Sequence, residues 1–209
     1  IKNKNIKKFQ GKDLYQYTLK QALRLFKKKN IIVTTNEKKI INFCKLNKIK
    51  FIRRSKNLST GKTTGMQVLN NVKESVNDKN LDYIYLQVTS PLRRDLDIME
   101  SIRLFEKKKA NCLISVTDMF VNPLMCNKII KNSMYNFIKK KISLTQSQKL
   151  EKYYQINGAI YIIKKKFISE KGSFYQIKNS IPFFMKKRNS IDIDDNEDFE
   201  IAEKLYEFK

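Results

Sequence analysis

Short apolar runs alternate with longer segments in the first half of the chain, and in the longer segments apolar residues recur every third or fourth position. The runs at 31–35, 50–53, 83–88 and 112–116 predict buried strands, because β-branched and aromatic residues are concentrated in them. The segments between them predict helices of about 10–15 residues. Strands that alternate with helices in this way indicate an α/β fold with a doubly wound, mostly parallel sheet, whose ligands bind at the carboxyl ends of the strands.

The helices between these runs are predicted from their caps and their apolar faces. Asp13 is expected to cap a helix that runs to about Lys29. Asn36 opens a second helix, whose apolar face consists of Ile40, Phe43, Cys44 and Leu46. A third helix is expected around 66–76, and a fourth is expected to end near Lys109.

The second half of the chain has a weaker pattern. The alternation fades beyond Asp118, and the polar sequence that follows has little periodicity. We expect a lid or a small dimerisation arm within about 119–180. A long strand is predicted at 153–163 and an extended stretch at 183–194, and a helix from about Glu197 closes the chain.

The composition changes this picture mainly through one missing residue type. The chain has 209 residues, which suits a single domain over 1–209, and it contains no histidine. The sequence therefore excludes Ser-His-Asp and Cys-His nucleophile systems and every metal site that needs histidine. An enzyme built from it has to use carboxylates, lysines, arginines and a bound metal ion.

The charge balance is strongly basic. Lys and Arg number 44 and Asp and Glu 20, which gives a formal net charge of +24. Such a charge fits a polyanionic partner, for example a nucleic acid or a phosphorylated substrate. The basic residues are scattered along the chain, however, which indicates that lysine is common at permissive positions throughout and not concentrated on one binding surface. We therefore do not expect a nucleic-acid partner.

Cysteine usage and hydropathy bear on the compartment. Cys44, Cys112 and Cys126 are far apart in the sequence, which is typical of free thiols in a reducing cytoplasm. No apolar stretch approaches about 18 residues, so we expect no membrane-spanning helix, and the first residues do not form a signal peptide.

The most informative segment for chemistry is 190–194, in which isoleucines alternate with Asp192 and Asp194. In a strand this alternation places both carboxylates on one face, with Cα atoms roughly 7 Å apart. Two carboxylates beside substrate phosphates are suitable ligands for Mg²⁺. The alternative is a helix N-terminus, where acids complement the helix dipole, and this explains 195–198 better than the two earlier aspartates.

Three other segments carry weaker signals. Residues 87–93 follow a buried strand and can orient a substrate there, or they form an ordinary turn. Asn157 and Tyr161 interrupt an apolar strand and can line a pocket, although a turn at Asn-Gly explains them as well. The lysines within 4–9 can contact phosphates, or they belong to a solvated terminus.

Taken together, these segments resemble the acylneuraminate cytidylyltransferases, also called CMP-N-acetylneuraminic acid synthetases, and the related CMP-nonulosonic acid synthetases. The resemblance rests on the order and spacing of 4–6, 51–54, 87–93, 157–161 and 190–194. It implies a Rossmann-like fold of the nucleotide-diphospho-sugar transferase type. It also implies a reaction in which a nine-carbon sugar acid attacks the α-phosphate of CTP, giving a CMP-sugar and pyrophosphate.

The resemblance assigns roles at the nucleotide end of the site. Lys4 and Asn5 are expected to contact the nucleotide, and Arg54 is expected to help hold CTP. Asp192 and Asp194 are expected to bind the catalytic Mg²⁺. Nucleotidyl transfer relies mainly on positioning and charge neutralisation, so this chemistry does not require a histidine base.

At the sugar end, the resemblance implies contacts from Gln87, Asn157 and Tyr161. Phe174 and Tyr175 match an aromatic pair that reaches into the neighbouring subunit's sugar pocket in the family. A homodimer in the cytoplasm is therefore expected, and the family's first strand and glycine-rich phosphate loop are expected to precede Ile1.

Three alternatives stay open at this point. A CMP-Kdo synthetase would use a shorter sugar acid, although the segment 157–161 favours the sialic acid type. A basic nucleic-acid-binding protein without catalysis would use the net charge of +24. An inactive relative is the third alternative, because Ser147 stands where the family tends to have an arginine and Met125 where it often has a base.

Overall fold

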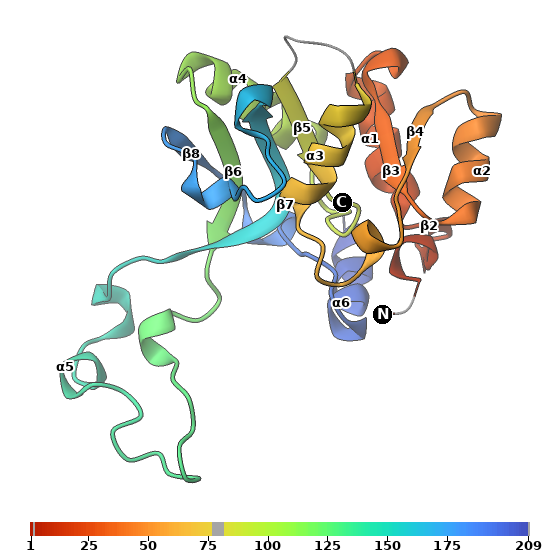
Figure 1. Ribbon diagram of the computed structural model, residues 1–209. Helices are drawn as coiled ribbons and strands as arrows, with labels where there is room; N and C mark the ends of the chain where they lie inside the picture. The colour runs from red at the N-terminus through yellow and green to blue at the C-terminus, as the bar shows by residue number, and fades with distance from the viewer. Residues whose placement is uncertain (2, 77–81, 209) are drawn as a thin grey trace.

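The computed structural model describes residues 1, 3–76 and 82–208 of the chain (Figure 1). A four-stranded sheet has the order β5-β7-β6-β8, and two smaller sheets pair β3 with β4 and β1 with β2. The strands are β1 (Lys8–Phe9), β2 (Lys12–Asp13), β3 (Ile32–Thr35), β4 (Lys50–Arg53), β5 (Asp82–Leu86), β6 (Cys112–Asp118), β7 (Tyr154–Lys164) and β8 (Ser180–Phe184).

In the four-stranded sheet and the β3–β4 pair, strand direction agrees with the predicted mostly parallel sheet, with β7 as the exception, whereas the short β1–β2 pair is antiparallel. β3 and β4 pair in parallel, and so do β6 and β8, whereas β7 runs antiparallel to both β5 and β6. The helix α4 separates β5 from β6, and a crossover of this kind keeps two strands parallel. The connection from β6 to β7 contains no such crossover, and the chain returns in the opposite direction.

Helices cover both faces of the four-stranded sheet. Their bounds are α1 (Tyr15–Leu25), α2 (Lys38–Leu46), α3 (Gly65–Ser75), α4 (Asp95–Lys107), α5 (Lys140–Ser143) and α6 (Asn196–Glu207). Alternate residues of β7 serve the two faces: Ile160 and Ile162 pack with α4, whereas Tyr161 and Ile163 pack with α3. The predicted doubly wound α/β arrangement is therefore confirmed.

Two details of the predicted helices are wrong. Asp13 does not cap α1 but lies buried in β2, where its carboxylate forms ion pairs with Lys8 (3.0 Å) and Lys39 (2.7 Å). Leu46 does not join the apolar face of α2 and is 84% exposed, because the buried face is completed by Ile41. Among the described residues, no helix has the length and apolar character needed to cross a bilayer.

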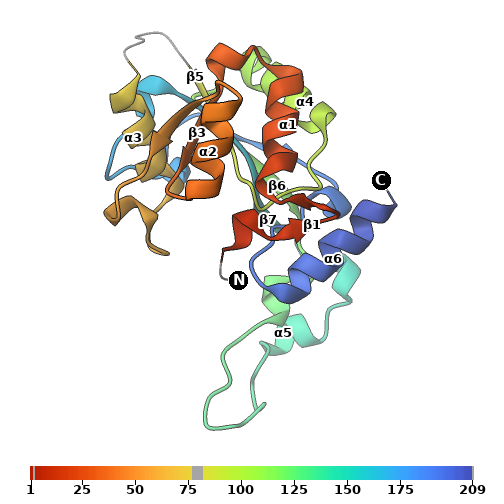
Figure 2. The same cartoon turned by 90° about the vertical axis from the view of Figure 1, so that its right-hand side faces the viewer.

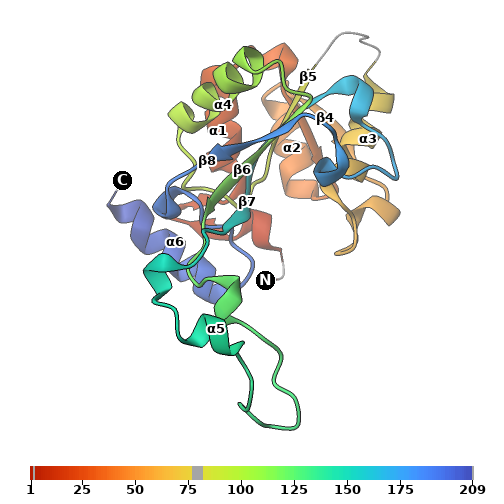
Figure 3. The same ribbon diagram turned by 90° about the vertical axis from the view of Figure 1, so that its left-hand side faces the viewer.

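The segment between β6 and β7 leaves the body of the molecule. Residues 119–153 contain the short helix α5 and several turns, and they project from the end of the sheet as an arm (Figure 1, Figure 3). Residues 154–180 fold back into the body through β7. The predicted lid or dimerisation region is thus an arm in shape over 119–153, and its role stays a prediction.

Candidate active site

A glycine in a left-handed conformation marks the centre of the candidate site. Gly158 has φ +69°, a region that side-chain-bearing residues rarely adopt. A Cβ added at this position would overlap Oε1 of Gln87 and lie 2.9 Å from Oδ2 of Asp192. Because Gly158 has no side chain, the Gln87 carboxamide and the Asp192 carboxylate can lie directly against the backbone of β7.

A bulge in β7 creates this position. The register between β6 and β7 shifts between Ile114 and Val116, which pair with Tyr161 and Ile156 respectively. Ser115 bridges the irregular stretch, since its hydroxyl donates to Asn157 Oδ1 (2.6 Å) and accepts from the Ile160 amide (2.8 Å). Bulges commonly redirect side chains beside functional sites, and this one turns 157–158 toward the end of β5.

Asn157 is a buried link between three elements. Its carboxamide oxygen accepts from Ser115, and its amide nitrogen donates to the Ser190 hydroxyl at 2.9 Å. Asn157 is only 2% exposed, and these contacts tie β6 and β7 to the start of the aspartate segment. The structure thus gives Asn157 a positioning role for Asp192, and its direct contact with a sugar acid stays a prediction.

The aspartate segment 190–195 belongs to no strand, which corrects the sequence-based expectation. It follows the short helical turn Lys187–Asn189, and the Ile193 amide donates to the Thr89 carbonyl at 2.9 Å. Ile193 is fully buried and Asp194 is exposed, but Ile191 and Asp192 are both half-buried, so the predicted alternation of buried isoleucine and accessible aspartate is only partly present. One backbone contact and one buried side chain hold the segment against the loop after β5.

Asp192 faces the centre of this site. Burial raises the pKa of its carboxyl, a hydrogen bond from Thr89 opposes that shift, and the nearby charge of Asp194 adds to it. Oδ1 of Asp192 is buried and has no hydrogen-bond partner among the described residues. A buried carboxylate oxygen without a partner is costly, and a bound cation or donor would relieve that cost.

Asp194 lies on the outer side of the same segment. Its side chain is 80% exposed and forms an ion pair with Lys4 (Nζ–Oδ1 3.0 Å), and Lys4 also donates to the Ile193 carbonyl. Lys4 and Asn5 belong to one 3-10 turn, Lys4–Ile6, so the structure brings both beside the aspartate segment. Their predicted contact with a nucleotide is not tested by these interactions.

Aromatic rings form one wall of the site. Tyr161 stacks on Phe174 with ring centroids 4.5 Å apart and lies 6.0 Å from the Tyr85 ring. Burial is the main cause that raises the pKa of both tyrosines. Phe174 is buried in its own chain, whereas Tyr175 is 62% exposed. Of the predicted aromatic pair, only Tyr175 is therefore free to reach a neighbouring subunit in this conformation.

Tyr85 belongs to the site although the sequence alone did not single it out, and Thr89 was included only as part of the segment 87–93, without a role of its own. The Tyr85 hydroxyl bonds with Gln87 and lies near Arg54, which follows β4. Nε of Arg54 is buried without a hydrogen-bond partner in the part of the chain that the structure describes. The alternation along β5 was the available signal, because Tyr85 and Gln87 share one face of that strand.

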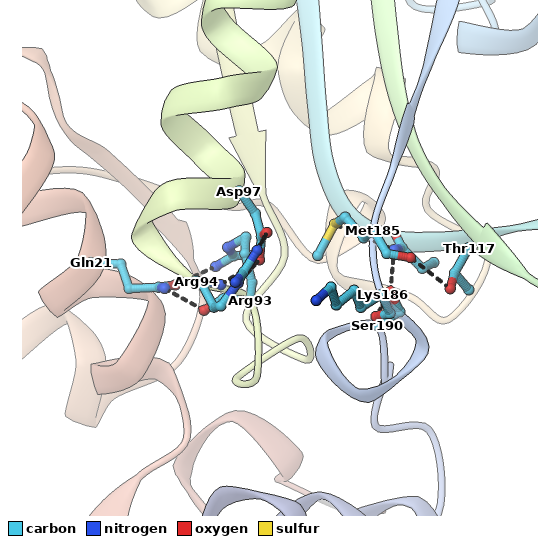
Figure 4. A network of polar contacts seen from close by, with 9 residues as sticks. Gln21, Arg93, Arg94, Asp97, Thr117, Met185, Lys186 and Ser190 are labelled. Carbon is cyan, nitrogen blue, oxygen red and sulfur yellow. Dashed lines mark hydrogen bonds and ion pairs between the residues drawn. The ribbon is translucent and has the colours of Figure 1, made fainter. Parts of the chain in front are cut away.

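Arg93 supports the site from behind. Its fully buried guanidinium donates to the carbonyls of Gln87 (3.2 Å) and Ala159 (2.6 Å), and to Thr18 and Gln21 of α1. Burial lowers the pKa of Arg93 to about 10, so the side chain remains charged at neutral pH. Figure 4 shows Arg93 with Gln21 of this network, next to Arg94 and Asp97, and a second group of contacts that consists of Thr117, Met185, Lys186 and Ser190.

The donor atoms fit a magnesium ion that substrate helps to bind. Within the described ranges, no group of three or more Cys, Asp or Glu side chains could hold a metal. Asp192 offers an unpartnered oxygen, and Asp194 is close enough for its charge to raise the pKa of Asp192. Mg²⁺ is commonly held by one or two carboxylates together with water and substrate phosphates.

The chain is similar to several known proteins. The family described as Cytidylyltransferase matches residues 1–209. The N-acylneuraminate cytidylyltransferase of Escherichia coli is 28% identical over 203 residues, which cover 97% of this chain and 48% of that protein. The CMP-N,N'-diacetyllegionaminic acid synthase of Campylobacter jejuni is 28% identical over 220 residues, covering 100% of this chain and 90% of that protein.

The chain spans about half the length of the N-acylneuraminate cytidylyltransferases it matches and most of the length of the legionaminic acid synthases. Among solved structures, a CMP:2-keto-3-deoxy-manno-octonic acid synthetase complexed with CTP has a TM-score of 0.70. It is 15% identical, and the match covers 100% of this chain and 93% of that one. This likeness establishes the nucleotidyltransferase type of fold.

Proposed function

Because the chain belongs to the cytidylyltransferase family, we propose that the protein transfers a cytidylyl group from CTP to a nonulosonic, sialic acid-like sugar acid. The products are a CMP-sugar and pyrophosphate. The observation that carries the proposal is the convergence of Gln87 and Asp192 over Gly158 at the end of β5. Relatives of matching length are named as synthases of CMP-linked legionaminic acid, a sugar acid of this class.

The chain's own residues supply binding and orientation in this reaction. The anomeric hydroxyl of the sugar acid forms a bond to the α-phosphorus of CTP and releases its proton to water, the bond to the bridging oxygen breaks, and pyrophosphate leaves with that oxygen. Gln87 and Tyr161 are proposed to hold the sugar acid, the first through its carboxamide and the second through its ring and hydroxyl. Lys4, Asn5 and Arg54 are proposed to contact the nucleotide, where positive charge lowers the barrier to phosphoryl transfer.

Asp192 and Asp194 would hold Mg²⁺ together with phosphate oxygens of CTP. When bound, the ion would neutralise triphosphate charge and polarise the α-phosphate. The unpartnered oxygen of Asp192 supports this assignment from the protein side. Asn157 and Thr89 keep the carboxylate in place, the first through Ser190 and the second through its own hydrogen bond.

We further propose that two copies of the chain associate through the arm 119–153. Its apolar side chains are strongly exposed, with Ile129 at 65%, Ile130 at 69% and Leu144 at 77%. Side chains of this kind are usually covered by a partner surface. We expect the reaction to take place in the cytoplasm, where CTP is available.

The proposal is tested by incubating the protein that carries this chain with CTP, Mg²⁺ and single sugar acids. The panel contains neuraminic, legionaminic and pseudaminic acids and Kdo, and pyrophosphate release and CMP-sugar formation are measured. Turnover with a nonulosonic acid, lost upon chelation of Mg²⁺, is expected. Turnover with Kdo alone would replace the substrate assignment, and no turnover with any sugar acid would overturn the function.

The variant Asp192→Asn links that activity to the site. We expect turnover to fall by at least about tenfold, because the amide cannot supply the negative charge that a metal-assisted phosphoryl transfer needs. Asp82→Asn is the matched control, since Asp82 is exposed at the opposite end of β5. Equal turnover in both variants would remove Asp192 from the catalytic assignment.

A further inference from the structure

A separate pocket is lined by residues of α1, β2 and α6. Figure 2 shows that α1, the hairpin β1–β2 and α6 lie near one another. Its volume is about 290 Å³, close to the lower end of the range for small-molecule sites, which begins near ~300 Å³. The residues that line it are Lys12, Tyr17, Lys20, Gln21, Arg24, Pro91 and Tyr206. None of them belongs to the constellation around Gly158.

Positive charge converges on this pocket from two elements. Lys12 comes from β2 and Lys20 from α1, and in the described ranges 1, 3–76 and 82–208 neither ammonium group has an ion pair with a carboxylate. The two groups are close enough that the charge of Lys12 is the main cause of a lowered pKa of Lys20. Like charges that face each other across a pocket favour an anion between them, because it converts repulsion into two attractions.

The remaining walls are polar and fixed. Arg24 forms a bidentate pair with Asp95 (both contacts 2.8 Å), which offsets the charge of Asp95. The Tyr17 hydroxyl donates to the Phe9 carbonyl at 2.6 Å, and the Tyr17 ring meets Tyr206 edge to face. Lys12 and Lys20 are thus the lining residues whose ammonium groups can donate hydrogen bonds to a ligand in the pocket.

The pocket is separated from the candidate active site by protein. Gln21 lines the pocket, and its carboxamide bonds with Arg93, which is fully buried. Arg93 in turn contacts the carbonyl of Gln87 on the far side. A ligand in the pocket would therefore not occupy the same space as a nucleotide or sugar acid bound at Asp192.

We propose that this pocket is a binding site for a small phosphate-bearing anion. A doubly charged tetrahedral oxyanion can accept hydrogen bonds from both ammonium groups at once and leave its other oxygens for water. The volume exceeds that of inorganic phosphate alone, so a phosphate monoester of modest size also fits. The site does not depend on the proposed transfer reaction.

The test is isothermal titration of inorganic phosphate into the protein at low ionic strength. The double variant Lys12→Gln/Lys20→Gln is compared with Lys28→Gln/Lys29→Gln, which removes the same charge from an exposed turn after α1. We expect the pocket variant to weaken binding at least about tenfold, because it removes both paired cations, and the control to change it less than about twofold.

Three outcomes would overturn the proposal. Wild-type protein could show no binding of millimolar phosphate, both double variants could weaken binding equally, or the pocket variant could bind as wild type does. The second outcome would assign the effect to the general charge of +24, and the third would place the phosphate elsewhere. The readout is binding alone, so it is independent of whether the protein transfers cytidylyl groups.

Discussion

Gly158 shows how one missing side chain assembles a site. Its positive φ allows the bulge in β7, and its lack of Cβ allows Gln87 and Asp192 to approach the backbone. The Asn-Gly pair in the sequence suggested a turn, and in the structure it is a bulge inside the long strand β7. Both interpretations use the same conformational freedom of glycine.

The substitution Gly158→Ala is expected to harm the site more than the fold. The left-handed conformation costs an alanine about 1–2 kcal/mol of stability, and the added methyl group displaces the Gln87 carboxamide. We therefore expect a modest loss in chemical denaturation and a larger loss of cytidylyl transfer. Gly61→Ala is the control, because nothing lies within 4 Å of a Cβ at Gly61. Similar behaviour of the two variants would contradict this account.

The raised pKa of Asp192 predicts a conflict between stability and function. A raised pKa means that the folded state holds the proton more tightly than the unfolded state does. The carboxyl therefore costs stability as the pH rises from the ordinary aspartate pKa through the raised folded value. Asp192→Asn is expected to increase the free energy of unfolding at neutral pH, although it lowers turnover.

Urea denaturation at neutral pH and near about pH 4 measures this effect, since an unperturbed aspartate titrates around the lower value. The advantage of Asp192→Asn is expected to shrink at the lower pH, because the raised pKa of wild-type Asp192 leaves less of its carboxyl ionised there. A variant that is less stable than wild type at neutral pH would show that the ionised carboxylate stabilises the fold instead.

The sequence allowed part of the site to be predicted at this scale. Gln87, Tyr161 and Asp192 were expected together, and the structure brings them together around β7. Tyr85 was missed, because a tyrosine within an apolar strand produces no distinctive one-dimensional pattern, and Arg93 was included only as the end of the segment 87–93, without its supporting role. Their roles depend on which strands become neighbours, which periodicity alone does not determine.

At the scale of elements, periodicity located the strands well and their directions less well. The predicted runs at 31–35, 50–53 and 112–116 correspond to β3, β4 and β6 within a few residues. The reversed direction of β7 depends on the long connection before it and not on its own residues. The error at Asp13 has a similar origin, because Lys8 and Lys39 come from other elements and offer that carboxylate a better partner than a helix end.

Arg93 joins three elements, and its replacement tests that role. Arg93→Leu leaves acceptors on β7, after β5 and on α1 without a donor, so we expect a loss of about 3 kcal/mol or more. Arg103→Leu, on the exposed side of α4, is expected to cost less than about 0.5 kcal/mol. The comparison is made by chemical denaturation, and equal losses would contradict a special role for Arg93.

The conservative variant Arg93→Lys separates positioning from folding. It keeps a charge but supplies a single donor group, which cannot reach both carbonyls that Arg93 holds. Because one of those carbonyls belongs to Gln87, we expect KM for the sugar acid to rise while KM for CTP changes little. Parallel changes in both KM values would indicate a general structural defect.

At the scale of the whole molecule, the arm carries a prediction about assembly. Ile130 and Tyr135 are 69% and 86% exposed, and replacing both with Asp is expected to convert a homodimer into monomers. Light scattering after size-exclusion chromatography measures the mass against the 24.8 kDa of one chain. Leu46→Asp is the control, because Leu46 is equally exposed on α2 but lies in the body. A wild-type protein that is monomeric would contradict the proposed dimer.

The contacts of the Arg93 guanidinium also affect which parts of the protein unfold locally together. Separating α1 from the ends of β5 and β7 would leave the buried Arg93 charge without its acceptors. The carbonyls that Arg93 holds would lose their donor in the same event. These three elements are therefore expected to open together, so their slowest amide protons should exchange with solvent at a common rate. The arm 119–153 provides none of these acceptors to the Arg93 guanidinium, so its amide protons are expected to exchange with solvent without unfolding the rest of the molecule.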